Sequence, residues 1–228
     1  MAESNQSPPI RTNYRNIPWI LCQWVLQVFF VLWLRYQSRG KEHLPAEGGG
    51  LMVSNHQSFL DPLLIGLPLK RPVSFMARDS LFRVPLLGPF MRYEFVIPIS
   101  RSAASSQSFR AAIQNIEYGN FVGIFPEGTR TTDGAVQRFK PGFLALLKRT
   151  DCAIYPIGIA GAFHALPRGA YYLRPRPVRV VYGKPIMAAE IRAYCERGAE
   201  KELLELTRQR VIECQRQAEE WLPPEATV

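Results

Sequence analysis

A histidine and an aspartate five positions apart are the residues in this sequence best suited to acid–base chemistry. His56 and Asp61 belong to the segment Asn55-His-Gln-Ser-Phe-Leu-Asp61, which follows a short apolar run. A carboxylate that accepts one imidazole N–H fixes the tautomer of the ring and stabilises the cation formed when the other nitrogen takes a proton. Such a pair acts as a general base. On a continuous helix the two side chains would lie about 140° apart, so they can meet only across a turn.

The same residues also suit a structural role. Asp61-Pro62 is typical of a helix start, with the aspartate as N-cap and the proline at the first helical position. Ser58 and Asp61 have the spacing of a capping box. Spacing alone leaves catalysis and capping both open. The sequence contains no Gly-x-Ser-x-Gly nucleophile motif. A general base here would therefore act on a substrate hydroxyl that attacks an already activated carbonyl, such as a thioester.

A second cluster combines a carboxylate, a glycine and two cations. Phe125-Pro-Glu-Gly-Thr-Arg130 follows a strand-like apolar run, which places it at the carboxyl end of a strand, where open α/β sheets bind ligands. Gly128 lets the backbone approach a ligand closely, and Arg130 and Lys140 suit a phosphate. Glu127 would pair with Arg130 or receive a substrate. The alternative is a solvated turn with a surface ion pair.

Two further arginines end strand-like segments. Arg78 follows Val73-Ser-Phe-Met-Ala, and Arg101 follows Phe95-Val-Ile-Pro-Ile-Ser. A guanidinium group offers a planar fork that matches a phosphate. Each arginine is therefore a candidate phosphate ligand, or else simply a charged strand end.

The composition narrows the class of protein. The 228 residues are 47% apolar and 21% charged, which fits one globular domain and excludes a largely disordered chain. The net charge of +9 indicates an anionic partner: nucleic acid, anionic lipid headgroups or a phosphorylated small molecule. The sequence shows no nucleic-acid recognition module, so we expect no nucleic-acid partner. The four cysteines lack metal-binding or disulfide-framework spacing, and we expect reduced thiols and no metal.

A basic, aromatic stretch suits an anionic membrane surface. No Asp or Glu occurs between Cys152 and Ala189. An ordinary solvated face would have the same composition, so both interpretations stay open. The side chains concerned are Arg168, Tyr171, Tyr172, Arg174, Arg176, Arg179 and Lys184.

The N-terminal apolar run predicts a helix associated with a membrane. Residues Ile17 to Leu34 would form a helix of about 27 Å, marginal for a bilayer core of about 30 Å. Gln23 and Gln27 are four positions apart and form one polar stripe. We expect this helix to insert into or lie within one leaflet, with a buried helix of the domain as the alternative. A secretory signal is not expected, since no small-x-small cleavage site follows.

The elements that would position the candidate residues alternate between strands and helices. We expect a single-domain α/β sandwich with a mostly parallel, mixed central sheet, preceded by the membrane-associated helix. The expected division is residues 1–40, a polar arm and the apolar helix, and residues 41–228, the domain. Strands are predicted at 51–54, 73–77, 95–99, 121–125, 153–159 and 178–182. Helices are predicted at 62–67, 86–93, 109–116 and 142–148, and as one or two helices over 190–221.

Together these segments resemble the glycerolipid acyltransferase family, which includes the 1-acylglycerol-3-phosphate acyltransferases. The resemblance covers roughly residues 50–186. Asn55-His-Gln-Ser-Phe-Leu-Asp61 resembles the first family block, Val96-Ile-Pro-Ile-Ser-Arg101 the second and Phe125-Pro-Glu-Gly-Thr-Arg130 the third. Ile154-Tyr-Pro-Ile resembles the fourth block. Phe95 stands where the second block usually has a glycine, and Arg78 where a lysine is common, so the acceptor stays open.

The resemblance implies an enzyme, an O-acyltransferase. His56 and Asp61 would be the catalytic pair, and the acceptor would be bound by Arg101, Glu127, Gly128, Thr129 and Arg130, with Lys140 and Arg78 as further candidates. An acyl group would pass from acyl-CoA or acyl-carrier protein to the hydroxyl of 1-acylglycerol-3-phosphate, giving phosphatidic acid, with no cofactor beyond the co-substrate. Another lysophospholipid, lyso-ornithine lipid or glycerol 3-phosphate are alternative acceptors. A non-catalytic lipid-binding membrane protein is the alternative of another class. We expect the protein on the cytoplasmic face of the inner membrane.

Overall fold

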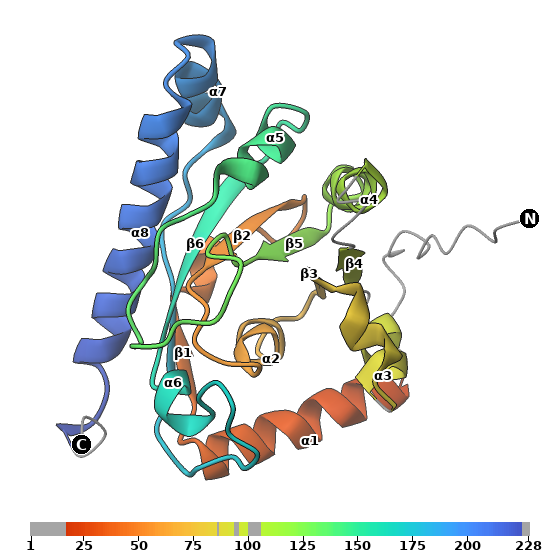
Figure 1. Cartoon of the computed structure of the whole chain (residues 1–228), viewed down its shortest axis with the longest axis vertical. Helices are drawn as coiled ribbons and strands as arrows, with labels where there is room; N and C mark the ends of the chain where they lie inside the picture. The colour runs from red at the N-terminus through yellow and green to blue at the C-terminus, as the bar shows by residue number, and fades with distance from the viewer. Residues whose placement is uncertain (1–16, 86, 94–95, 100–105, 225–228) are drawn as a thin grey trace, which may run out of the picture.

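The computed structural model of the chain describes residues 17–85, 87–93, 96–99 and 106–224. These residues build a sheet with helices on both of its faces (Figure 1). Arg101, one of the candidate phosphate ligands, lies outside the described residues.

The described residues form a seven-stranded sheet of order β1-β7-β6-β2-β5-β3-β4. The strands are β1 (Gln37–Arg39), β2 (Gly50–Ser54), β3 (Val73–Arg78), β4 (Ile97–Ile99), β5 (Phe121–Ile124), β6 (Ala153–Ala160) and β7 (Arg179–Tyr182). All neighbouring pairs are parallel except β6 and β7. The expected mostly parallel, mixed sheet is confirmed. β2 lies at its centre, where every residue of the strand is buried.

Helices cover each face of this sheet with apolar side chains. One core lies between the sheet and α1 (Ile17–Trp33), α2 (Asp61–Gly66) and α6 (Ala162–Ala165). The other lies between the sheet and α4 (Ser106–Glu117), α5 (Leu144–Leu147), α7 (Ala188–Glu196) and α8 (Glu200–Glu220). α3 (Leu87–Tyr93) follows β3. Short 3-10 turns occupy Lys41–His43, Asp79–Arg83 and Pro141–Phe143.

Most expected elements are present, but α6 was not expected, and the helix expected over 142–148 is a 3-10 turn followed by the short α5. The segment 190–221 forms two helices, which Gly198 separates with a left-handed φ of 67°. β1 was not expected as a strand, because three residues are too short for a recognisable alternation. It pairs with β7, and the expected boundary between residues 40 and 41 falls directly after it.

α1 turns its polar stripe inward and its apolar side outward. Phe30 and Leu34 enter the core, and Gln23 is 9% exposed. The described apolar side chains on its other sides are exposed: Ile20, Leu21, Trp24, Val25, Val28, Phe29, Val31, Leu32 and Trp33. Within the described part of the chain, we find no helix that combines the length and the apolarity needed to cross a membrane.

Candidate active site

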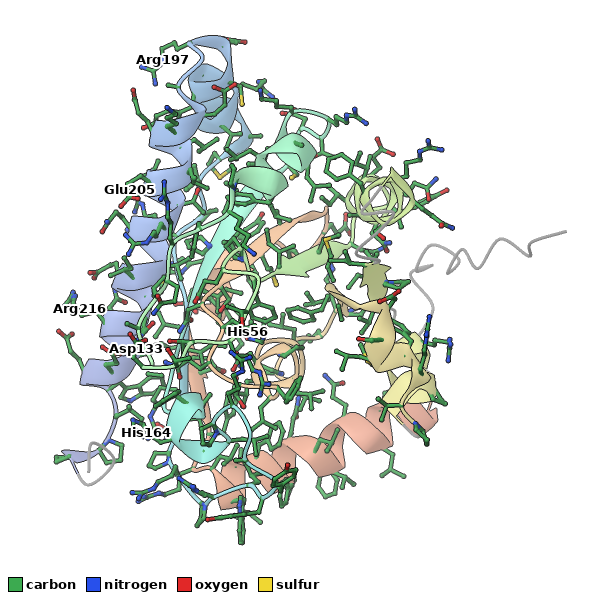
Figure 2. The ribbon with its side chains drawn as sticks, viewed as in Figure 1. His56, Asp133, His164, Arg197, Glu205 and Arg216 are labelled. Carbon is green, nitrogen blue, oxygen red and sulfur yellow. The ribbon has the colours of Figure 1, made fainter. Side chains whose placement is uncertain are left out.

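The two candidate loops follow neighbouring strands. β2 and β5 are parallel and in register, with Val53 opposite Ile124, so the loops that leave them emerge at the same edge of the sheet. Figure 2 shows His56 beside α2, between that helix and the loop that carries Asp133. The fold thus brings the first and third sequence blocks together.

His56 and Asp61 meet across a turn. The His56 Nδ1 lies 2.8 Å from Asp61 Oδ2. The turn closes through the Asp61 N–H, which donates to the Ser58 carbonyl at 3.3 Å. The same carboxylate oxygen accepts the backbone N–H groups of Gln57 at 2.6 Å and Ser58 at 2.8 Å. The carboxylate therefore faces the loop before it, and α2 has no side-chain cap hydrogen bond.

Burial separates the roles of the two partners. The Asp61 side chain is 0% exposed, whereas the His56 side chain keeps 19% of its surface. Burial raises the pKa of Asp61, and the hydrogen bonds from His56, Ser58 and Gln57 oppose that rise by favouring the carboxylate. A buried carboxylate that receives three N–H groups orients the imidazole, and the partly exposed imidazole remains reachable for a substrate.

Stacked aromatic rings hold the imidazole from one side. The rings of His56 and Phe125 are stacked with centroids 4.2 Å apart and planes 17° apart. Phe125 in turn stacks on Phe75 from β3 at 5.6 Å. The ring orientation of His56 is therefore fixed by Asp61 at one edge and by Phe125 on one face.

Glu127 ties the two loops together through their backbones. Its Oε1 accepts the His56 N–H at 2.9 Å, and its Oε2 accepts the Gln137 N–H at 3.3 Å. A second link runs from the Thr131 N–H to the His56 carbonyl at 2.8 Å. Glu127 is 3% exposed, and burial raises its pKa to about 7. The family resemblance implies acceptor binding for Glu127; in the structure its two carboxylate oxygens accept backbone N–H groups, one of them from His56.

The cations of the second cluster lie on the solvent side of this arrangement. The Arg130 guanidinium stands 3.6 Å from the centroid of the Phe59 ring, in the turn between His56 and Asp61. Gly128 has a left-handed φ of 71°, and a Cβ at this position would lie 2.8 Å from the Lys140 Nζ. Gly128, Thr129 and Lys140 are exposed. Arg130 thus borders the turn that carries the His–Asp pair, and the Lys140 ammonium lies close to Gly128 in the neighbouring loop.

The other sequence candidates are placed only in part. Arg78 ends β3, where it pairs with Ile99, so its backbone lies at the same edge of the sheet. Its side chain and all of Arg101 lie outside what the structure describes. Among the described residues, no cluster of His, Cys, Asp and Glu could hold a metal ion.

An amide network behind the site was not predicted. The Asn55 Nδ2 donates to the Ile159 carbonyl and to Gln215 Oε1, each at 2.9 Å. Gln215 and Gln57 both donate to the Gly134 carbonyl at 3.0 Å. Asn55 and Gln57 flank His56 in the sequence, which is a signal that could have suggested their role. Gln215 has no such signal.

A close helix–strand contact brings Gln215 to this network. A Cβ at Gly158 in β6 would lie 2.1 Å from the Gln215 backbone nitrogen in α8. Only glycine lets the two backbones approach this closely. Gln215 can then reach the loops after both β2 and β5.

Comparisons with known proteins identify the family of the chain. A family model described as acyltransferase matches residues 35–160, more than half of the chain. The chain belongs to the acyltransferase family. The matched segment contains His56, Asp61 and the 125–130 loop, whereas Gln215 lies beyond it. The candidate loops after β2 and β5 therefore lie within the segment that the family model matches, and α8 contacts them from outside it.

Two curated relatives and one solved structure show how far the likeness extends. The chain is 32% identical over 166 residues to a chloroplast 1-acyl-sn-glycerol-3-phosphate acyltransferase of Arabidopsis thaliana, covering 71% of this chain and 46% of the relative. It is 30% identical over 188 residues to a 1-acyl-sn-glycerol-3-phosphate acyltransferase of Pseudomonas aeruginosa, covering 80% and 71%. The crystal structure of a 1-acyl-sn-glycerophosphate acyltransferase from Thermotoga maritima matches with a TM-score of 0.64 and 27% identity, covering 82% of this acyltransferase and 78% of that chain. The chain thus spans about half the length of the plant relative.

Proposed function

We propose that this acyltransferase moves a fatty acyl group from acyl-CoA or acyl-carrier protein to the free hydroxyl of 1-acylglycerol-3-phosphate, giving phosphatidic acid. The observation that carries the proposal is the 2.8 Å hydrogen bond between His56 and the buried Asp61, in a chain whose curated relatives bear the name of this activity. The proposed reaction uses no cofactor beyond the thioester co-substrate.

The proposed mechanism is general-base catalysis with direct attack. The His56 Nε2 takes the proton of the acceptor hydroxyl while its oxygen attacks the thioester carbonyl. Asp61, bonded to Nδ1, stabilises the imidazolium that forms. The tetrahedral intermediate then expels the thiolate, which takes the proton back from the imidazolium. The products are the new ester and the free thiol, and His56 returns to its neutral form.

Arg130 and Lys140 suit the phosphate of the acceptor. The Arg130 guanidinium lies over Phe59 in the turn that carries the catalytic pair, and the Lys140 ammonium lies close to Gly128 in the neighbouring loop. A guanidinium offers two parallel N–H donors to phosphate oxygens. Held this way, the phosphate would present the neighbouring glycerol hydroxyl to His56, and positioning of this kind supplies a large part of a rate enhancement. We include Arg78 and Arg101 as further phosphate ligands.

The exposed apolar side of α1 supports association with one leaflet of a membrane. Nine described apolar side chains of α1 face solvent. Among them, Trp24 is 61% exposed and Leu32 is 75% exposed. Tyr171 and Tyr172 are also exposed, and the Trp33 indole N–H donates to the Leu173 carbonyl, which joins the basic stretch to the end of α1. An apolar helix flanked by arginines and tyrosines suits a lipid surface with anionic headgroups.

We place the catalytic domain on the cytoplasmic face of that membrane. The cysteines whose side chains are described, Cys152, Cys195 and Cys214, are free thiols. Free thiols are typical of a reducing compartment, where thioester donors are also met.

A panel of acceptors tests this proposal. Purified protein is incubated with palmitoyl-CoA carrying a labelled acyl chain and, separately, with 1-acylglycerol-3-phosphate, a second lysophospholipid, lyso-ornithine lipid or glycerol 3-phosphate. We expect labelled phosphatidic acid from the first acceptor and little label in the other products. Transfer to another acceptor alone would replace the proposed substrate. No label in any product would favour the lipid-binding alternative.

A further inference from the structure

The inward polar stripe of α1 has a role that membrane association does not explain. A helix that merely lies in a leaflet gains nothing from two glutamines on its protein side. The Gln23 amide donates to the carbonyls of Leu67 at 2.6 Å and Leu69 at 2.9 Å. The Gln27 amide donates to the same Leu67 carbonyl. Both glutamines therefore serve the segment that directly follows α2.

The far end of α2 is held in part by side chains from other elements. The last carbonyls of a helix have no partner within it. The Tyr36 hydroxyl donates to the Leu64 carbonyl, and the Tyr182 hydroxyl donates to the Ile65 carbonyl, each at 2.7 Å. The Leu69 N–H donates to the Gly66 carbonyl. The two glutamines bind the next carbonyls along the chain, those of Leu67 and Leu69. The carbonyls at this end of the short helix are therefore all hydrogen-bonded.

The other end of α2 begins at Asp61, which carries the proposed catalytic carboxylate. α2 runs from Asp61 to Gly66, so it has fewer than two turns between Asp61 and the carbonyls that α1 holds. Asp61, Leu64 and Ile65 are each 0% exposed, and close-packed elements of this length move as one body. A shift at Leu67 therefore reaches the Asp61 carboxylate and its hydrogen bond with His56. Figure 1 shows α1 crossing the molecule next to α2.

We propose that Gln23 and Gln27 are positioning residues, which hold α2 and thereby set Asp61 against His56. This inference rests on the proposed function for its effect on turnover. α1 then has two separate faces: the exposed apolar face meets lipid, and the glutamine face positions the catalytic pair. The acceptor phosphate ligands, Arg130 and Lys140, are not part of this connection.

The test is a double variant, Gln23→Met with Gln27→Met, in the full chain. Methionine keeps the length of glutamine and removes the amide. We expect kcat for lysophosphatidate to fall by about tenfold to a hundredfold, as misplacement of a catalytic group does. We expect the acceptor KM to change by less than about twofold, because the phosphate ligands are untouched. Binding to vesicles of phosphatidylglycerol and phosphatidylethanolamine should stay unchanged. Gln37→Met, an exposed glutamine in β1, is the matched control and should behave as wild type.

A second measurement does not depend on activity. The proton on the His56 Nδ1 gives a downfield NMR resonance when it is hydrogen-bonded to Asp61. We expect this resonance to shift or broaden in the double variant and to stay in place in Gln37→Met. If wild type transfers no acyl group, the proposed function fails, while the resonance still tests this inference.

Two results would overturn the inference. One is a double variant with wild-type kcat and an unchanged resonance. The other is a lower kcat with an unchanged resonance, because the loss would then arise elsewhere. If the double variant does not fold, Tyr36→Phe removes one hydroxyl from the same end of α2. It should move the resonance in the same direction, and an unmoved resonance with wild-type turnover contradicts the proposal.

Discussion

The loops after β2 and β5 and the helix α1 both turn polar groups inward, but they leave different surfaces outside. In the loops, the buried carboxylates of Asp61 and Glu127 accept hydrogen bonds from backbone N–H groups. The cations Arg130 and Lys140 lie on the solvent side of the same loops. In α1, the buried Gln23 amide donates hydrogen bonds to backbone carbonyls, whereas Trp24 and Leu32 are exposed. Burial of a polar group without a partner is costly, and each of these three buried side chains takes part in at least one hydrogen bond, although Asp61 Oδ1 has no partner among the described residues. The outer surface differs because one region suits a charged headgroup and the other suits lipid tails.

The largest expected effect removes the carboxylate that defines the first region. In Asp61→Asn the amide can no longer accept the His56 proton as a carboxylate does and cannot stabilise the imidazolium. We expect kcat to fall by about 10⁴-fold, as in other sites where an orienting carboxylate is amidated. Steady-state kinetics and a melting curve check this. Asp79→Asn, outside the site, is the control; wild-type turnover in Asp61→Asn would reduce the contact to a structural one.

A pH series examines the buried carboxylate that joins the two loops. Burial raises the pKa of Glu127 from 4.5 to about 7, so the folded protein favours the protonated form more than the unfolded chain does. The contribution of Glu127 to the free energy of unfolding is therefore fully present below about pH 4.5 and is lost as pH rises through about 7. Relative to Glu127→Gln, wild type should lose on the order of 3 kcal/mol of unfolding free energy between these limits.

Urea unfolding of both proteins at pH 5 and pH 8 measures the difference. A wild type that gains stability relative to Glu127→Gln on going to pH 8 would show that the carboxylate is stabilised, rather than destabilised, by its surroundings.

How much of these two regions could be predicted from the sequence depends on the distance over which each contact acts. His56 and Asp61 meet within a five-residue segment, so their pairing follows from residue type and the need for a turn. The strands that precede the two loops are equally local, since 51–54 and 121–124 are short, mostly apolar runs. The inward role of Gln23 requires the carbonyls of Leu67 and Leu69, and that of Gln215 requires Gly158. No pattern along the chain connects residues so far apart.

A third prediction separates the headgroup surface from the catalytic pair. Arg130→Ala removes a charged donor next to the turn of His56 and Asp61. We expect the KM for 1-acylglycerol-3-phosphate to rise by about thirtyfold, since a hydrogen bond to a charged group contributes about 2 kcal/mol. The KM for palmitoyl-CoA should stay within about twofold of wild type. Arg138→Ala, an exposed arginine of the same loop, is the control. An unchanged acceptor KM would remove Arg130 from the phosphate ligands.

The smallest expected effect concerns the lipid surface. Leu32→Ser replaces a side chain that is 75% exposed on the outer face of α1, so folding should be unaffected. Loss of one buried leucine from the lipid interface should weaken vesicle binding by about tenfold. Co-sedimentation with vesicles measures this. Met187→Ser, which is also exposed but lies outside α1, should bind as wild type; equal binding by all three proteins would remove α1 from the membrane contact.

The release of free thiol from palmitoyl-CoA tests the central claim most directly, with wild type and His56→Ala compared in the presence and absence of lysophosphatidate. We predict acceptor-dependent thiol release by wild type and a loss of about 10⁴-fold in His56→Ala, as large as that in Asp61→Asn, with both proteins melting at similar temperatures. Thiol release by a folded His56→Ala at the wild-type rate would contradict general-base catalysis by the His56–Asp61 pair.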